Sequence, residues 1–228
     1  MAGSAQLPLD LGHAPAFSAS DFLVTGCNAE ANGWVERWPH WPASALALWG
    51  PPGCGKSHLA EVFRQRSGGI RLAAAALVDE DLPGLAEAPA VVVEDADQGV
   101  DEASLLHLYN LIGEARHHLL LTGRQPPARW RLTLPDLRSR LSSIPVAAIG
   151  APDDGLLEAL LLKLFADRQL RIGPEIVSFL LPRMERSFDA VRALVAAIDG
   201  AALSGQRPVT IPLLRQVLGN GAASSGDG

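Results

Sequence analysis

Short apolar runs alternate along the chain with longer segments whose apolar residues recur at helical spacing. Five such runs stand at 45–49 (ALALW), 70–73 (IRLA), 90–94 (AVVVE), 118–122 (HLLLT) and 146–149 (VAAI). Runs of this length between turn residues are typical of strands that are buried on both faces of a parallel sheet. The segments between them are long enough for crossover helices. Residues 21–150 are therefore predicted to form an α/β domain around a five-stranded parallel sheet.

The pattern changes at residue 151, after which only helical spacing remains. Pro or Gly residues separate four apolar, helix-like segments, at 153–170, 174–184, 187–203 and 211–218. These segments predict a small all-helical domain over 151–220. Residues 1–20 are rich in Ala, Gly, Pro and Ser and are predicted to be a flexible tail. The last eight residues, GAASSGDG at 221–228, are predicted to be disordered.

Composition narrows the class of protein. The 228 residues suffice for one main domain and one small one. A net charge of -6 and scattered basic residues argue against a surface for direct sequence-specific DNA binding. No apolar run approaches the roughly 18 residues of a membrane span. With two cysteines, Cys27 and Cys54, and no signal-peptide pattern, we expect a soluble, cytoplasmic protein without a membrane partner.

The strongest chemical motif is GPPGCGKS, which follows the first predicted strand and precedes a helical segment. This is the phosphate-binding loop G-x-x-x-x-G-K-[ST] in its required strand, loop and helix context. Gly53 and Gly55 let backbone N–H groups converge on phosphate oxygens, Lys56 reaches the β and γ phosphates, and Ser57 ligates magnesium. A glycine-rich turn with an incidental lysine is the alternative, and for His58 the pattern favours a packed first-turn residue over a ligand. The candidate nucleotide-binding residues are Gly50, Pro51, Pro52, Gly53, Cys54, Gly55, Lys56, Ser57 and His58.

Carboxylates follow the third predicted strand, in AVVVEDAD. Proteins with a phosphate-binding loop use such a position to complete their magnesium site, which makes Glu94 the partner of Ser57 there. Asp95 and Asp97 are close by, and Thr122 ends the next strand where it could orient a water near the γ phosphate. An acidic turn in solvent, and a threonine that merely forms a turn, remain the alternatives.

The tail contains QLPLDL, with Gln6 followed by leucines at 7, 9 and 11. Each leucine left in water forgoes roughly 1.5 to 3 kcal/mol of possible burial. Leu7, Leu9 and Leu11 are therefore predicted to be buried by a partner. An edge strand folded back on its own domain is the alternative, because proline and alternating leucines also suit sheet edges.

These motifs, in this order, resemble the AAA+ ATPases of the DnaA family, and within it the short Hda-type regulatory inactivators. The resemblance runs from Gln6 to Leu218, and the chain is expected to stop before the helix-turn-helix domain of the initiators. Four segments carry it beyond the phosphate loop: the clamp-binding motif at 6–11, the adenine-side segment FLVTGCNAEA at 22–31, the arginine-finger box LPDLRSRL at 134–141 and the sensor II helix FDAVRALVAAID at 188–199.

The resemblance implies a P-loop AAA+ three-layer αβα domain followed by a helical lid. It implies ADP or ATP with Mg²⁺ as cofactors, and the sliding clamp, DnaA and a possible homo-oligomer as partners. Arg140 would be the finger that stimulates hydrolysis of DnaA-bound ATP. Arg192 would be sensor II. Residues on the adenine side would be Phe22, Val24 and Asn28.

Each of these residues could instead have an ordinary structural role. Arg140 could be an ordinary surface arginine, Arg192 a helix-face partner in a salt bridge, Phe22 and Val24 plain core, and Asn28 a helix cap. For the whole chain the alternatives are a helicase-loader-type AAA+ ATPase and a small nucleotide kinase.

Two departures from the family pattern bear on catalysis. Glu94 stands where the family usually has Asp, so that Asp95 falls at the position of the catalytic acid. Arg124 stands near the place where sensor I usually has an acidic or amide residue. We therefore expect weak or no intrinsic ATPase activity with nucleotide binding intact.

Overall fold

The structure is a computed structural model that describes residues 23–205 and 207–224. The leucine motif at 6–11 and Phe22 lie outside these residues. Five strands form one sheet in the order β2-β3-β4-β1-β5, and every neighbouring pair is parallel. They are β1 (Ala45–Trp49), β2 (Ile70–Ala73), β3 (Ala90–Glu94), β4 (His118–Gly123) and β5 (Val146–Ala148). The predicted sheet is confirmed, with β4 one residue longer and β5 one residue shorter than expected.

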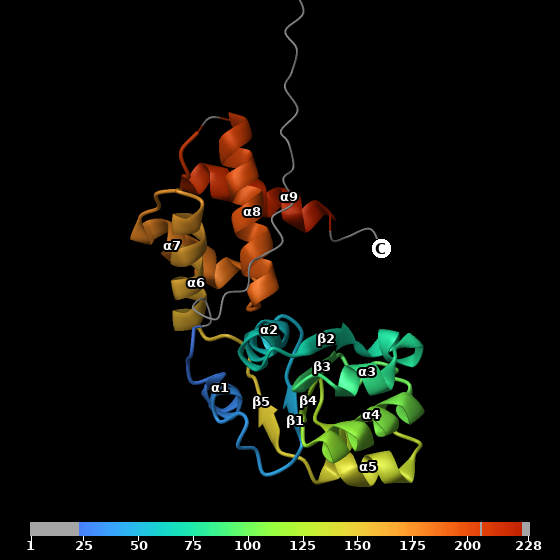
Figure 1. The fold of residues 1–228 in the computed structure, drawn as a ribbon. Helices are drawn as coiled ribbons and strands as arrows, with labels where there is room; N and C mark the ends of the chain where they lie inside the picture. Colours follow the sequence, from blue (N-terminus) through green and yellow to red (C-terminus); the bar gives the residue numbers. More distant parts are fainter. Residues whose placement is uncertain (1–22, 206, 225–228) are drawn as a thin grey trace, which may run out of the picture.

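Helices cover both faces of this sheet because its strands carry buried side chains on both sides. Leu46 and Leu48 pack on one face with Phe63, whereas Val91 and Val93 pack on the other. Figure 1 shows the resulting three layers. The first face holds α1 (Ala29–Glu36) and α2 (Lys56–Ser67); the second holds the 3-10 segments η2 (Ala74–Asp79) and η3 (Pro127–Arg129) with α3 (Leu82–Ala86), α4 (Glu102–Ala115) and α5 (Pro135–Ser142).

A carboxylate at the start of α4 fixes the entry to α5. The Glu102 side chain accepts hydrogen bonds from the backbone N–H groups of Thr133 (2.9 Å) and Leu134 (2.7 Å). These donors hold the pKa of Glu102 below its usual range. The charged form is therefore favoured at neutral pH, and it anchors the loop that leads into α5.

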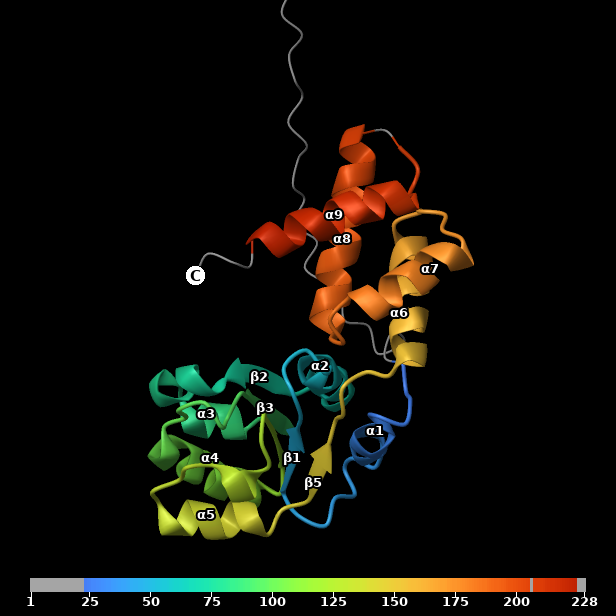
Figure 2. The ribbon, with the colours of Figure 1, turned by 180° about the vertical axis from the view of Figure 1, so that it is seen from behind.

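The helical lid has a core of its own. Phe165, Leu180, Val195 and Leu214 are fully or almost fully buried among its helices. The lid consists of α6 (Asp154–Asp167), α7 (Pro174–Leu180), the 3-10 turn η4 (Leu181–Arg183), α8 (Phe188–Gly205) and α9 (Ile211–Ser224), and it lies at one end of the sheet (Figures 1 and 2). No helix within residues 23–205 and 207–224 is long and apolar enough to cross a membrane.

The last helix continues further than the sequence pattern suggests. Helix α9 reaches Ser224, six residues past Leu218 and into the segment 221–228 for which disorder is predicted. Each added residue extends an existing helix by one hydrogen bond, so elongation is cheaper than nucleation. The two alanines at 222 and 223 also favour helix. The prediction of disorder from the composition of residues 221–228 therefore missed this extension of α9.

The lid meets the α/β domain at the loop between β1 and α2. The backbone N–H of Phe188, at the start of α8, donates to the carbonyl oxygen of Gly53 at 2.8 Å. Ser187 is buried beside that glycine, and its side chain caps α8 by accepting from the N–H of Ala190 at 3.1 Å. A Cβ on Gly53 would lie 2.7 Å from the Cβ of Ser187. The absence of a side chain at Gly53 therefore allows the lid to dock.

We expect Gly53→Ala to destabilise the protein more than Gly68→Ala. Both glycines have left-handed backbones, with φ of +66° and +65°, so an alanine at either costs about 1–2 kcal/mol. Only Gly53 faces the lid, whereas a Cβ on Gly68 meets nothing within 4 Å. The clash with Ser187 adds about 1–3 kcal/mol. Urea denaturation measures the difference, and hydrogen exchange at α8 should rise in Gly53→Ala alone; equal destabilisation would contradict the docking role.

Candidate functional site

The candidate site is the loop Gly50–Ser57 at the carboxyl end of β1. Gly55 precedes the first turn of α2 with a φ of +100°, a backbone conformation that side chains rarely adopt. Helix α2 then begins at Lys56, and the N–H groups of its first turn have no partner within the helix. A helix N-terminus behind a glycine-rich loop is a ready anion site. The loop has the geometry that phosphate binding requires.

Lys56 is fixed over this loop. Its side chain is buried, and its Nζ donates to the carbonyl oxygens of Gly50 (2.8 Å) and Pro51 (2.9 Å). The Sγ of Cys54 lies 3.8 Å from the same nitrogen. Burial raises the pKa of the Cys54 thiol, so this residue is a neutral packing group under the loop. The ammonium group is the positive charge available to a phosphate here.

Glu94 ends β3 and has two differently placed carboxylate oxygens. Its Oε2 lies 3.3 Å from Nη1 of Arg71, whereas Oε1 is buried and has no hydrogen-bond partner among the described residues. Ser57, on the phosphate loop, is exposed. A hydroxyl and a carboxylate, completed by phosphate and water oxygens, suit Mg²⁺. The oxygen ligands of Glu94 and Ser57 are thus of the kind that Mg²⁺ takes. The described residues contain no group of three or more His, Cys, Asp or Glu that could hold a metal ion.

The turn after β3 is tied to the end of β4. The backbone N–H of Asp95 donates to Oγ1 of Thr122 at 3.1 Å, and that of Ala96 donates to the Thr122 carbonyl at 2.8 Å. Asp95 is exposed and has a φ of +55°, while Thr122 is buried. Thr122 thereby holds the turn that presents Asp95. Its predicted role with a water molecule stays a prediction.

Asp97 has a positional role that its sequence context did not indicate. Its Oδ2 accepts hydrogen bonds from the backbone N–H groups of Arg124 (2.7 Å) and Gln125 (3.1 Å), directly after β4. A Cβ on Gly123 would lie 3.1 Å from the carboxylate carbon of Asp97. The aspartate therefore shapes the turn that carries Arg124, the residue near the sensor I position.

The lid brings Arg192 one helical turn beyond the contact between Phe188 and the loop. Its side chain is half buried, and a carboxylate oxygen of Asp189 lies 3.9 Å from its Nη1. Burial lowers the pKa of the Arg192 guanidinium, and Asp189 partly opposes that shift. A guanidinium drawn out of water in this way gains from an anionic ligand.

The adenine-side segment lies beside the chain that leads from β5 to the lid. The carbonyl of Cys27 accepts from the N–H of Gly150 at 2.8 Å. Asn28 is buried and accepts from the N–H of Thr25 while it donates to the carbonyl of Leu23. Asn28 thus shapes the preceding loop, and its side chain makes no capping bond to α1. Val24 is 51% exposed and so is not plain core.

The structure does not bring Arg140 to the phosphate loop of its own chain. Helix α5 leads into the amino end of β5, whereas the loop follows the carboxyl end of the parallel strand β1. Figures 1 and 2 show α5 at the end of the α/β domain away from the lid. The Arg140 guanidinium pairs with Asp136 at 2.9 Å and lies 5.8 Å from the ring centroid of Tyr109. Arg138, two residues earlier, donates to the carbonyl of Leu132.

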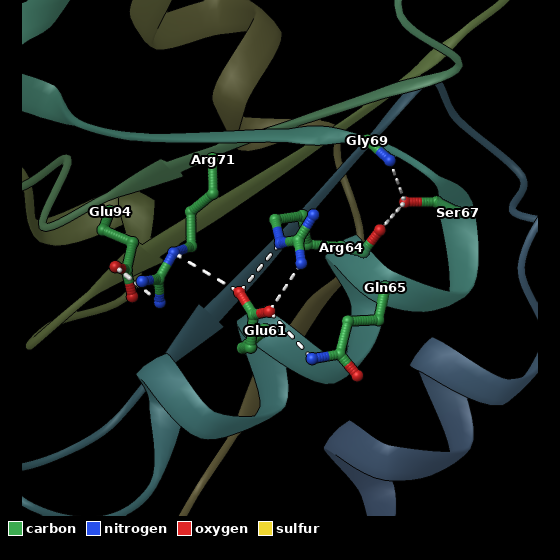
Figure 3. Close-up of polar contacts among 7 residues, drawn as sticks. All are labelled: Glu61, Arg64, Gln65, Ser67, Gly69, Arg71 and Glu94. Atoms are coloured by element: carbon green, nitrogen blue, oxygen red, sulfur yellow. Dashed lines mark hydrogen bonds and ion pairs between the residues drawn. The ribbon is translucent and has the colours of Figure 1, made fainter. Parts of the chain in front are cut away.

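Some contacts beside the candidate site escaped the sequence analysis. Arg71 and Glu61 were not singled out, although they form an ion-paired chain with Glu94 (Figure 3). Nothing local in the sequence joins residues 61, 71 and 94, because their contacts depend on the order and register of strands. For Ser187 a signal existed, since a serine immediately before an apolar helix is a typical N-cap.

Comparison with known proteins agrees with this geometry. Residues 153–218 match the family model described as "Hda, lid domain". Domain III of the replication initiation protein DnaA from Thermotoga maritima superposes with a TM-score of 0.79 at 14% identity, covering 90% of this chain and 97% of that one. AMPPCP-bound DnaA from Aquifex aeolicus gives 0.71 at 14% identity, covering 84% and 67%. The FIGL-1 AAA domain gives 0.63 at 13% identity, covering 89% and 83%.

These matches combine with the phosphate loop, the parallel sheet and the helical lid. The α/β P-loop AAA+ fold predicted from the sequence is confirmed. It carries an Hda-type lid after β5 rather than another kind of helical unit. Residues 153–218 thus match the Hda lid family, on a chain that has the AAA+ fold of DnaA.

Proposed function

We propose that this protein regulates replication initiation by switching off DnaA. It binds an adenine nucleotide at Gly50–Ser57, attaches to the sliding clamp through Gln6–Leu11, and directs Arg140 at ATP held by DnaA. The observation that carries the proposal is the match of residues 153–218 to the Hda lid, on an AAA+ fold. The tail motif and the finger box add support from the sequence.

Adenine nucleotide is the ligand that the relatives favour, because DnaA with the same fold has been solved with AMPPCP. In this chain the loop amides and Lys56 would bind the phosphates, while Ser57 and Glu94 would hold Mg²⁺. Bound magnesium supplies charge neutralisation to the phosphates. Arg192, on the helix that touches the loop, would sense the nucleotide from the lid side. The nucleotide bound to the protein at rest would set the conformation of the lid.

Arg140 would act on a nucleotide that another protein holds. Its helix leads into the amino end of β5, at the edge of the sheet opposite the chain's own loop. In the DnaA-bound ATP, water attacks the γ phosphorus while the bond from that phosphorus to the β–γ bridging oxygen breaks. A guanidinium at the γ phosphate stabilises the charge that develops there. Inactivation then follows from hydrolysis in the partner.

Different observations distinguish this proposal from the two alternative functions, a small nucleotide kinase and a helicase loader. The AAA+ fold argues against a small nucleotide kinase, and a phosphotransfer assay tests that alternative directly. A helicase loader shares the fold and could also use a finger in trans. It would be recognised by DNA binding and by an effect on helicase loading in place of any effect on DnaA.

Lys56→Ala should abolish nucleotide binding. Removing one member of a buried charge pair costs about 2–5 kcal/mol, which corresponds to a loss of about 30-fold to 5,000-fold in affinity. Lys163→Ala is the matched control, because Lys163 is the chain's only other lysine and lies in the lid. Calorimetric titration with ADP and ATP measures both, with the intrinsic fluorescence of Trp34, Trp38, Trp41 and Trp49 as a second readout. Wild type that binds neither nucleotide would remove the basis of the proposal.

Leu9→Ala combined with Leu11→Ala should abolish binding to the sliding clamp. Each leucine loses about 1.5–3 kcal/mol of burial, so the pair costs at least about 100-fold. Pro8→Ala with Asp10→Ala changes only the variable positions of the motif and should bind normally. Surface plasmon resonance on immobilised clamp measures this. A melting temperature several degrees lower for the leucine variant would mean that the tail packs on its own domain.

Arg140→Ala should eliminate stimulated hydrolysis of DnaA-bound ATP on a DNA-loaded clamp, a loss of about 10³ to 10⁵ in rate. Its exposed ion pair with Asp136 is worth at most about 1 kcal/mol, so the fold should persist. Lysine at 140 should also fail, since an ammonium lacks the planar fork of guanidinium.

Asp136→Ala is the control, because it removes the ion pair of Arg140 and keeps the guanidinium. It should retain stimulation. Full activity of Arg140→Ala would shift the role to Arg138. A wild-type protein that never stimulates DnaA would refute the regulatory function and favour the helicase loader.

A further inference from the structure

We infer that Arg71 is a positioning residue for the magnesium-side carboxylate. Its guanidinium holds one oxygen of Glu94 so that the other oxygen is presented to the metal ion of a bound nucleotide. This inference rests on the proposed nucleotide site. It adds to that site a residue of β2, a strand that is separated from the phosphate loop by helix α2.

The contact follows from the register of the edge strand. Ala73 on β2 is the register partner of Glu94 on β3, so Arg71 lies two residues earlier on the same face of the sheet. From there Nη1 of Arg71 reaches Oε2 of Glu94 at 3.3 Å (Figure 3). One oxygen of the carboxylate is thereby engaged.

Helix α2 holds the arginine from its other side. Nε of Arg71 lies 3.7 Å from Oε2 of Glu61, and Glu61 in turn accepts hydrogen bonds from Arg64 at 2.9 and 2.7 Å. The hydrogen bonds from Arg64 hold the pKa of Glu61 below its usual range, so its carboxylate stays charged. Figure 3 shows the chain that runs from Arg64 through Glu61 and Arg71 to Glu94. The helix that begins at the phosphate loop thus restrains the metal-side carboxylate.

The unpartnered carboxylate oxygen of Glu94 indicates that a ligand binds there. Oε1 is buried, and no donor among the described residues bonds to it. Burying a charged oxygen without a partner is costly, and a metal ion or a metal-bound water removes that cost. Because Arg71 occupies Oε2, Oε1 is the oxygen left for the metal.

The arrangement also accounts for a glutamate at this position. The family usually has an aspartate, and glutamate adds one rotatable bond whose freedom must be lost on binding. An ion pair that orders the carboxylate beforehand reduces that loss. Mutation of a residue that orients a metal ligand in this way typically lowers metal affinity by 10- to 100-fold.

A simple charge effect would have the opposite sign. Arg71 is a cation near the proposed metal, so repulsion alone predicts that its removal strengthens Mg²⁺ binding. Positioning predicts that its removal weakens Mg²⁺ binding. The direction of the change therefore decides between the two.

The experiment measures ATP and ADP affinity by calorimetry in EDTA and across a Mg²⁺ titration, using the whole chain. In Arg71→Gln the Mg²⁺ affinity of the nucleotide complex should fall about 10- to 100-fold, with affinity in EDTA unchanged. Glu94→Gln should lose at least as much Mg²⁺ affinity, and the double variant should lose no more than Glu94→Gln alone. Arg66→Gln is the matched control, since Arg66 lies on the same helix but donates to the carbonyl of Glu36, outside this chain of contacts.

Failures of the two proposals are distinguishable. Unchanged or stronger Mg²⁺ binding in Arg71→Gln overturns the positioning role while nucleotide binding stands. Additive losses in the double variant, or an equal loss in Arg66→Gln, overturn it as well. If wild type binds no nucleotide at all, the proposed function fails and the inference with it. Melting curves in EDTA check that each variant is folded.

Discussion

The hydrogen bond from the Phe188 amide to the Gly53 carbonyl is the constraint on which the two halves of the molecule depend. It joins a lid with its own apolar core to the loop that would hold the phosphates. The peptide unit is planar, so holding the carbonyl also fixes the orientation of the Gly53–Cys54 peptide. Ser187 and the Phe188 ring also lie against Gly53 and Gly55, so a shift of the loop would disturb the start of α8. This contact is where a nucleotide in the proposed site would be coupled to the lid.

The parallel sheet separates the two activities of the proposed regulator. Its carboxyl edge carries the phosphate loop, Glu94 and the docked lid, while its amino edge receives the chain from α5 with Arg140. Glu102 anchors the entry to α5 through the amides of Thr133 and Leu134, so the helix that carries the candidate finger has a fixed base. A protein built in this way can bind its own nucleotide with one edge and present a guanidinium with the other.

Sequence reasoning found the parts of the structure that depend on neighbours along the chain. The strands were predictable because their apolar runs end at turn residues, and the phosphate loop because its spacing is diagnostic. The pair of Arg140 with Asp136 has the i,i+4 spacing that could have revealed it. The contact of Arg71 with Glu94 could not be found in this way, because it depends on β2 lying beside β3 in one register. Long-range pairing is the information that a single sequence lacks.

The acids after β3 show how similar residues acquire different tasks. Glu94 is ion-paired with Arg71, and Asp97 is engaged by the amides after β4. Asp95 is exposed, on a turn that Thr122 holds by its backbone. Of the three carboxylates, Asp95 is thus the one whose described contacts involve only its backbone, which makes it the candidate base for any water attack in this chain's own site. An exposed base is hydrated, and with Arg140 at the opposite edge of the sheet, slow intrinsic hydrolysis is the expected consequence.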